Sequence, residues 1–590
     1  MTISLNWDLA SLFTGGSQSA TLADFLDQII TDLNNFRPNL DPLTVQNQAE
    51  WAAQIQHLYD ITTRLDHASA FVGCLVSQDV NDDKAFQLEA QSDQLWAQLG
   101  THWTKLTALF AQQDETAWAD LINNTELKHV AFNLNELREL ARQKMSPELE
   151  ALATELAADG YHGWNRLYNT VSGDKQVMLL GEELSLGQLQ NRYEDDPDRE
   201  VRRKAFELYE ASWLKLAKTC AASLNNQAGF RLTLYKNRGW DSILKEPLMN
   251  NRLSRETLEA MWSTIDSKNG KLLDYLSAKA KRLGLEQLHW YDVFAPVGEV
   301  AKTFTYQEAG EFVIEAMKRF NPDIAQFCRM AIDKEWIESE NRSGKRAGGF
   351  CTSFPVNGET RIFMTYNGSY NGMLTLAHEL GHSYHDWVMR DLPYGASQYA
   401  MNVAETASTF NELVVNDASL RATDDPQERL SLLGAKLSNA MAMLMNIKSR
   451  FDFEMAFFER RAKQQLSVDE LNELMVTAQR NAFKDSLVNY HPYFWASKLH
   501  FYITEAPFYN FPYTFGYLFS NGVYAQALSE GPAFVDRYIA MLRDTGSMDT
   551  EILAHTHLGV DLTKPEFWET ALDRILGDVD TFVDLVDKMA

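Results

Sequence analysis

The sequence has few cysteines, no long apolar run and no recognisable export signal. Four cysteines in 590 residues lie far apart and form no CxxC pair, which excludes a disulfide scaffold and is typical of buried structural thiols. The start, MTISLNWDLASLF, has no basic segment and no continuous apolar segment, so we expect no secretory signal. No apolar stretch reaches the roughly 18 residues of a membrane span. We therefore expect a soluble protein of a reducing compartment, most simply the cytoplasm.

Positive charge is also scarce. The chain has 54 Lys and Arg against 81 Asp and Glu, which gives a formal net charge of −27. Nucleic acids and anionic membranes are bound through concentrated positive fields, so we expect neither as a partner. Apolar residues make up 45% and charged residues 23%, the balance of an ordinary globular protein. The sequence predicts a monomer or a homodimer and does not decide between them.

Helical periodicity dominates the chain. Residues 21–36 place Leu22, Leu26, Ile29 and Leu33 on one stripe, the pattern of an amphipathic helix. Similar patterns predict helices at 50–67, 83–112, 146–159, 197–237, 255–283, 308–319, 426–464, 467–484 and 565–588. Short strands are expected at 175–180, 349–354 and 361–366, the last two around a turn at 355–358. The fold class is therefore mainly α, and we place a helical N-terminal region at 1–190 and a catalytic region at 191–590.

The segment 370–386, YNGMLTLAHELGHSYHD, contains an HExxH motif on a predicted helix. Residues four apart on a helix are rotated by only about 40° and separated by about 6 Å. His378 and His382 can therefore bind one zinc ion from the same face. Glu379 is placed to take a proton from a zinc-bound water. Gly381 weakens a helix and indicates the close approach of another element, whereas His385 offers either a fourth nitrogen ligand or, as we favour, a packed role.

A zinc site needs a third protein ligand, and no histidine follows His385 until His491. Asp386 has a side chain too short to bend back to the same metal. A helix is expected to begin near Val403 with Glu405 and Glu412 on one face. We assign Glu405 as the third ligand and Glu412 as the acceptor for the second ring nitrogen of a ligating histidine.

These motifs resemble those of the oligoendopeptidase F and thimet oligopeptidase family of zinc metallopeptidases. The resemblance rests on HELGHSYH followed by AETASTFNE, on WYDVFAP at 290–296 and on FYNFPYTFGYLF at 508–519. It implies one zinc ion per chain, held by His378, His382 and Glu405 with Glu379 as general base. It also implies a two-lobed, clam-like helical body with the site deep in a central channel. Family enzymes cleave short peptides and spare folded proteins.

Substrate contacts are expected on both sides of the metal motif in the sequence. The strand at 361–366, which contains Phe363 and Tyr366, would align an extended peptide by edge pairing, and the RAGGF loop with Gly348 and Gly349 would offer flexible backbone nearby.

Tyrosines and a histidine near the C-terminus stabilise the oxyanion in the family. Members often have a histidine before FY, where this chain has Pro507. Either an insertion has displaced the motif to His500, or another group serves. Tyr509, Tyr513 and Tyr517 compete for the donor roles, and packing in the core is the alternative for each.

The sequence thus predicts a zinc-dependent endopeptidase that acts on internal bonds of short unstructured oligopeptides. An exopeptidase would need a clamp for a charged terminus, and no acidic or arginine motif for one is apparent. A helical binding protein with an accidental HExxH motif would hold no stoichiometric metal.

Overall fold

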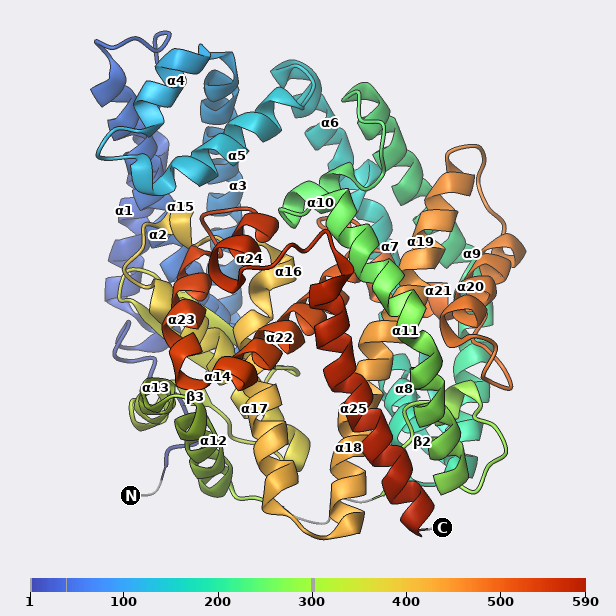
Figure 1. Cartoon of the computed structure of the whole chain (residues 1–590). Helices are drawn as coiled ribbons and strands as arrows, with labels where there is room; N and C mark the ends of the chain where they lie inside the picture. The colour runs from blue at the N-terminus through green and yellow to red at the C-terminus, as the bar shows by residue number, and fades with distance from the viewer. Residues whose placement is uncertain (1–2, 39, 299–302, 590) are drawn as a thin grey trace. The chain divides into compact units, whose positions relative to one another are not determined.

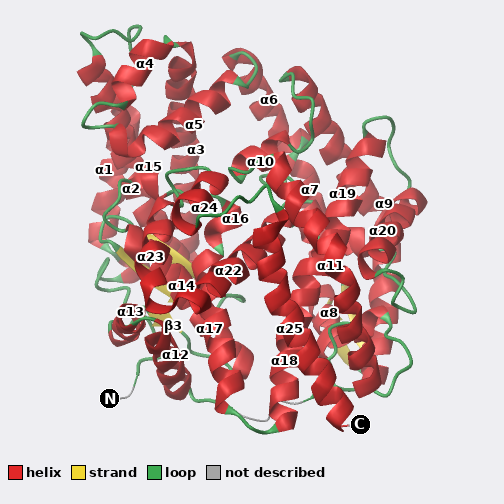
Figure 2. Cartoon of the chain, in the orientation of Figure 1, coloured by secondary structure: helices red, strands yellow, loops and turns green. Residues whose placement is uncertain are grey.

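The computed structural model describes residues 3–38, 40–298 and 303–589, and its main component is α-helix (Figures 1 and 2). The predicted helices all have counterparts. The range 83–112 coincides with α3 (Asp83–Gln112), and 565–588 with α25 (Pro565–Met589). The long range 426–464 is interrupted by a π-helical turn at Ala442–Asn446. Strands form only two small sheets among the described residues, so the expectation of a mainly α fold is confirmed.

The chain divides into two compact units, each assembled from three segments. The first comprises residues 1–144, 302–418 and 526–559, and the second comprises residues 145–301, 419–525 and 560–590. The boundary that we expected near residue 190 therefore lies inside the second unit.

The first unit begins with five helices, α1 (Ala20–Asn35), α2 (Gln48–Gln78), α3, α4 (Glu115–Ile122) and α5 (Ala131–Arg142). Its middle segment holds α12 (Tyr306–Phe320), α13 (Pro322–Asp333), β3 (Ile337–Glu338), β4 (Phe350–Phe354), β5 (Glu359–Phe363), α14 (Tyr370–Met389), α15 (Tyr394–Ser397), α16 (Met401–Ala404) and α17 (Thr406–Ala422). Its last segment holds α23 (Val535–Asp544) and α24 (Thr550–Leu558). Helix α17 extends a few residues into the second unit.

A three-stranded sheet lies against α14 in the first unit. The strand order is β3-β5-β4, with β5 parallel to β3 and antiparallel to β4. Phe354 and Phe363 join the apolar core that α1, α2 and α3 build around Trp51 and Phe71. The sheet thus joins α14 to the apolar core of the first unit. The predicted small sheet beside the HExxH helix is confirmed.

The second unit holds α6 (Pro147–Gly160), α7 (His162–Gly173), α8 (Leu186–Asp195), α9 (Arg199–Asn237), α10 (Lys245–Asn250), α11 (Arg255–Arg282), α18 (Pro426–Met441), α19 (Ile447–Arg461), α20 (Val468–Phe483), α21 (Phe494–Ser497), α25 and most of α22 (Phe511–Glu530). Its hairpin pairs β1 (Gln176–Leu179) with β2 (Glu182–Ser185). Helices α11 and α25 lie side by side (Figure 1). The strand expected at 175–180 is the first half of this hairpin.

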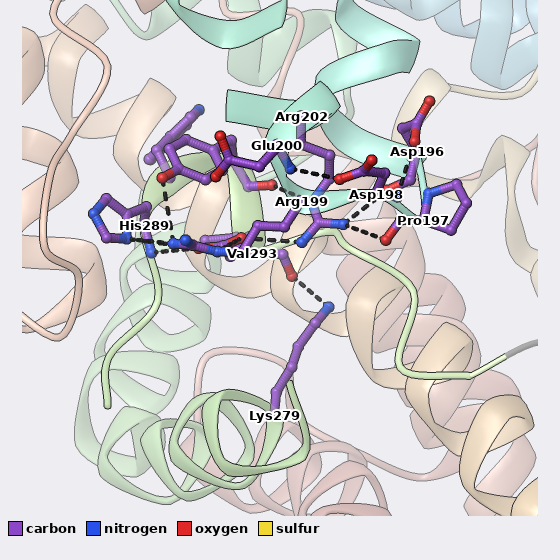
Figure 3. Close-up of polar contacts among 12 residues, drawn as sticks. Asp196, Pro197, Asp198, Arg199, Glu200, Arg202, Lys279, His289 and Val293 are labelled. Carbon is purple, nitrogen blue, oxygen red and sulfur yellow. Dashed lines mark hydrogen bonds and ion pairs between the residues drawn. The ribbon is translucent and has the colours of Figure 1, made fainter. Parts of the chain in front are cut away.

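A buried ion-pair network ties the start of α9 to the WYDVFAP segment (Figure 3). Asp292 is fully buried and accepts hydrogen bonds from Arg199 at 2.9 Å and from Arg202 at 3.1 Å. Its second oxygen also accepts from the backbone N–H of His289 at 3.1 Å. Lys279, also fully buried, donates to the Val293 carbonyl at 2.7 Å. The motif residue Asp292 is therefore placed to hold the second unit together.

One helical run among the described residues, Pro426–Arg461, is long and apolar enough to cross a membrane by length and composition. We expected no such run from the sequence. Within the structure 72% of its apolar window is buried, as in the core helix of a globular unit.

Candidate active site

Helix α14 presents the HExxH motif from a fixed position. Ser369 caps its start, where the hydroxyl accepts a hydrogen bond from the Gly372 N–H at 3.0 Å. At Gly381 a Cβ atom would lie 2.5 Å from the Ala407 carbonyl oxygen and 2.5 Å from the Ser408 Cα. Only glycine permits this approach of α14 to α17. The close contact that the sequence predicted at Gly381 is confirmed.

Three side chains bring potential metal ligands to one point. The Nε2 atoms of His378 and His382 are 3.1 Å apart. The Oε2 atom of Glu405 is 3.3 Å from the first nitrogen and 3.4 Å from the second. Among the described residues, these three side chains form a group whose spacing could hold a metal ion. The structure thus brings together the three ligands proposed from the sequence.

The spacing of these atoms fits zinc. Ligand atoms at about 2.0–2.1 Å from a tetrahedral centre are about 3.3–3.4 Å from one another. The observed triangle, with edges of 3.1, 3.3 and 3.4 Å, matches this closely. Two imidazoles and one carboxylate are also a donor set that zinc prefers, and three protein ligands leave a fourth position for water or substrate. The residues present therefore fit a catalytic zinc site.

Glu405 lies between α16 and α17 rather than within one helix that begins near Val403. The Ser408 hydroxyl donates to Glu405 Oε2 at 2.7 Å and steadies the carboxylate. Burial opposes ionisation of Glu405, but hydrogen bonding to His382 and the charges of His382 and His378 outweigh it and lower its pKa to about 2. Glu405 is therefore held as an anion that faces the two imidazoles.

Glu412 lies on α17 behind His378. Its Oε1 atom is 2.5 Å from His378 Nδ1, so the Nδ1–H donates to the carboxylate and leaves Nε2 free to face the ligand triangle. Burial alone would lower the pKa of His378, but the hydrogen bond and charge of Glu412, with the charge of Glu405, raise it to about 9. Excess negative charge around the imidazoles therefore favours a cation at this point.

Glu379 is buried beside the triangle. Burial raises the pKa of its carboxyl group, and the two histidines oppose that rise. Its Oε2 atom is buried without a hydrogen-bond partner among the described residues. At Gly349 a Cβ atom would lie 3.3 Å from Glu379 Oε1, so a backbone without a side chain borders the carboxylate. One oxygen of this buried carboxylate is therefore not engaged by another described residue.

The other acids and bases of α14 point elsewhere. His385 is fully buried, and its Nε2 atom lies 2.9 Å from Thr545 Oγ1 and 3.1 Å from the Leu542 carbonyl. This geometry matches the packed role and not the fourth-ligand role. Asp386 accepts a hydrogen bond from the Tyr399 hydroxyl at 3.2 Å.

The expected peptide-binding edge at 361–366 is wrong. Strand β5 is the central strand, with β3 on one side and β4 on the other. Phe363 is 1% exposed and stacks on Phe350, and Tyr366 is 8% exposed and donates its hydroxyl to the Phe304 carbonyl at 2.9 Å. The outer strand next to α14 is β4, which pairs only with β5 among the described residues. Gly348 and Gly349 lead directly into this outer strand.

The C-terminal candidates belong to the second unit. His500 lies in a short 3₁₀ turn, and its ring centroid is 5.4 Å from Tyr509 and 6.2 Å from Tyr513. These two tyrosine rings are 5.7 Å apart, so the three residues form one aromatic cluster. Tyr517 is buried on α22 at 6% exposure.

Two hydrogen bonds near the ligand triangle were not predicted from the sequence. The hydrogen bond from Ser408 to Glu405 joins residues three apart, and this spacing, which puts both on one face of a helix, is the signal that could have indicated it. The Tyr399 contact to Asp386 joins segments with no shared periodicity, so the sequence carries no signal for it.

Comparisons with known proteins agree with this geometry. The family described as "Peptidase family M3" matches residues 192–574, more than half of the chain, and "Oligopeptidase F" matches residues 110–176. Oligopeptidase PepF of Bacillus subtilis is 24% identical, with 99% of this chain and 87% of the relative covered. Group B oligopeptidase PepB of Streptococcus agalactiae is also 24% identical, with 96% and 94% covered.

Solved structures share the fold. A putative peptidase from Chlamydophila abortus superposes with a TM-score of 0.84 at 19% identity, with 99% of both chains covered. Oligoendopeptidase-F from Enterococcus faecium gives a TM-score of 0.67 at 18% identity, with 96% of this chain and 98% of that chain covered. The family match over residues 192–574, on a chain that brings His378, His382 and Glu405 together at a spacing suited to a metal ion, shows that this protein belongs to peptidase family M3 and is a metalloendopeptidase.

Proposed function

We propose that the protein is a zinc-dependent oligoendopeptidase that hydrolyses internal bonds of short unstructured peptides. The observation that carries the proposal is the ligand triangle of His378, His382 and Glu405, with Glu379 beside it. The names of the relatives from Bacillus subtilis and Streptococcus agalactiae, both oligopeptidases, support short peptides as the substrate class.

One zinc ion held by His378, His382 and Glu405 would polarise the scissile carbonyl and lower the pKa of a water molecule toward about 7. The residues around it have separate tasks. Glu379 accepts the proton of the attacking water and donates it to the leaving amine. Glu412 fixes the tautomer of His378 through the 2.5 Å contact to Nδ1.

Main-chain groups near Glu379 are proposed to hold the substrate. The unpaired side of β4 offers N–H and C=O groups to an extended peptide, and Gly348 and Gly349 allow the peptide to approach the carboxylate closely. The contribution of Phe363 is then indirect, because it stacks on Phe350 of β4. The contribution of Tyr366 is indirect as well, because its ring packs against Tyr306 and its hydroxyl donates to the Phe304 carbonyl.

The aromatic cluster of the second unit is proposed to contact substrate as well. His500, Tyr509 and Tyr513 lie together, which supports His500 as the imidazole that Pro507 does not supply. A tyrosine hydroxyl, from Tyr509, Tyr513 or Tyr517, would donate a hydrogen bond to the oxyanion. We further propose a cytoplasmic enzyme, monomeric or homodimeric, without nucleic-acid or membrane partners, in keeping with the formal charge of −27.

A peptide-library digest tests the proposal. Doubly blocked peptides are incubated with enzyme, with and without a zinc chelator, and the products are identified by mass spectrometry. Internal cuts that the chelator abolishes support the proposal, and cleavage from free ends alone would replace it with an exopeptidase. Elemental analysis should find about one zinc per chain. Glu379→Gln should retain that zinc and lose turnover, while the exposed control Glu311→Gln keeps both.

A further inference from the structure

A cavity lies beside the C-terminal part of α14 in the first unit. Its volume is about 340 Å³, within the roughly 300–1,000 Å³ range of ligand pockets. Residues 351–354 of β4 form one wall, Asp386 and Met389 of α14 form a second, and Asp66 of α2 and the rings of Tyr394 and Tyr399 complete it. None of these residues is a proposed metal ligand.

The cavity is placed where a bound peptide would pass. Gly349 borders Glu379, and the cavity wall begins two residues further along the same strand, about 7 Å away. On α14, Asp386 follows His382 by one turn, about 6 Å along the helix axis. A peptide that pairs with the open side of β4 would therefore carry the side chain two or three residues from the scissile bond past this cavity.

The cavity walls carry unbalanced negative charge. Asp66 makes no hydrogen bond or ion pair to another described residue, and the one hydrogen bond of Asp386 comes from Tyr399. The basic residues nearby have other partners. Arg361 pairs with Glu359, a residue of the cavity wall, at 3.1 Å. Arg390 also lines the cavity, with its guanidinium stacked on Trp387 at 3.8 Å, so three carboxylates of the wall, those of Asp66, Asp386 and Glu359, face one lining cation.

Burial raises the pKa of Asp66 to about 6, and the charge of Asp386 adds to that rise. Two carboxylates in one partly buried hollow without a basic partner destabilise each other. A cation between them would relieve this repulsion.

We propose that this cavity is a specificity subsite that takes a cationic nitrogen of the substrate peptide, the side chain of a lysine or arginine two or three residues from the scissile bond. Asp66 and Asp386 supply the countercharge, and Tyr394 and Tyr399 pack against the aliphatic stem. The inference rests on the proposed endopeptidase activity, because it assigns one subsite of that same substrate track.

The test uses doubly blocked fluorogenic peptides on a neutral scaffold. Lysine is placed in turn at each position up to four residues from the cut, and norleucine, which has a stem of similar length without charge, is its partner. We expect kcat/KM to rise about tenfold for lysine over norleucine at one position two or three residues from the cut. A set with a free amino terminus at the same distance shows whether the α-amino group serves equally.

Asp66→Asn should reduce the ratio of kcat/KM for the lysine peptide to kcat/KM for the norleucine peptide to about threefold or less. The control Asp60→Asn, on the exposed side of the same helix and paired with Arg64, should change neither. Equal cleavage of the lysine and norleucine peptides by the wild-type enzyme at every position would overturn the subsite, and so would a full lysine preference in folded Asp66→Asn. If the wild-type enzyme cuts none of the scaffolds, the endopeptidase proposal itself fails, and the two failures are thereby distinguished.

Discussion

Asp292→Asn should destabilise the second unit strongly, because this buried side chain accepts hydrogen bonds from two arginines, Arg199 and Arg202 (Figure 3). Asp292 is fully buried and Arg202 is 2% exposed. Asparagine keeps the shape of the side chain but removes its charge and turns an NH₂ group toward guanidinium donors. The guanidinium of Arg202 cannot turn outward to be hydrated in the variant, since it also donates to the backbone carbonyls of Tyr291 and Asp196.

The magnitude follows from which groups are left unpaired. Removing one partner of a buried ion pair costs about 3–5 kcal/mol. Arg199 is 31% exposed and can regain water contacts, which reduces its share. Arg202 is buried and cannot regain water contacts. We therefore expect the free energy of unfolding to fall by about 3 kcal/mol, at the lower end of that range.

The assay is equilibrium unfolding in urea, followed by tryptophan fluorescence, since Trp290 is buried next to Asp292. Asp198→Asn is the matched control. This residue caps α9 through the Glu200 N–H, and asparagine caps about as well as aspartate, so its effect should stay within about 0.5 kcal/mol. Zinc content should not change, because the ligands lie in the first unit. A loss below about 1 kcal/mol for Asp292→Asn would refute the reasoning.

Two further predictions concern packing and pH. Gly381→Ala places a Cβ atom 2.5 Å from the Ala407 carbonyl, so it should cost about 1–3 kcal/mol and weaken zinc retention against a chelator, whereas Gly577→Ala, in open space on α25, should do neither. Burial lowers the pKa of Lys279 to about 7. The unfolded chain therefore binds more protons above that pH, and stability rises with pH. Lys279→Met should reduce this slope between pH 7.5 and 9.5 by up to about 1.4 kcal/mol per pH unit. The exposed control Lys281→Met should keep the slope, and an unchanged slope in Lys279→Met would contradict the assignment.

The metal motif could be predicted because its information is local. His378 and His382 share a face through helical periodicity alone, and one glycine in the same turn, Gly381, signals the close neighbour. Glu405, the proposed third ligand, lies on the next predicted helix, about 20 residues further along the sequence. The bounds of α3 and α25 followed equally well, since both helices have strong apolar stripes and clear starts, whereas α2 continues to Gln78, well past the predicted end at residue 67.

The order of the strands could not be predicted in the same way. Strand β3 has only two residues, Ile337 and Glu338, and no alternation that marks it as a strand. Its parallel pairing to β5 is set by tertiary packing, so β5 could be mistaken for an outer strand. The division into units of three segments each is likewise a property of long-range contacts, for which the composition of the chain shows no boundary.

The interruption at Glu405 shows what periodicity leaves undetermined at the site itself. The pattern from Val403 onward fits one continuous helix, but the structure ends α16 at Ala404 and starts α17 at Thr406. Glu405 therefore stands in a one-residue break, where it ends α16 and directly precedes α17. The two imidazoles and the Ser408 hydroxyl at 2.7 Å keep the carboxylate ionised there. These partners come from the facing helix and from one residue three positions on, so periodicity can place Glu405 on the correct face but cannot show the break in the helix at which it lies.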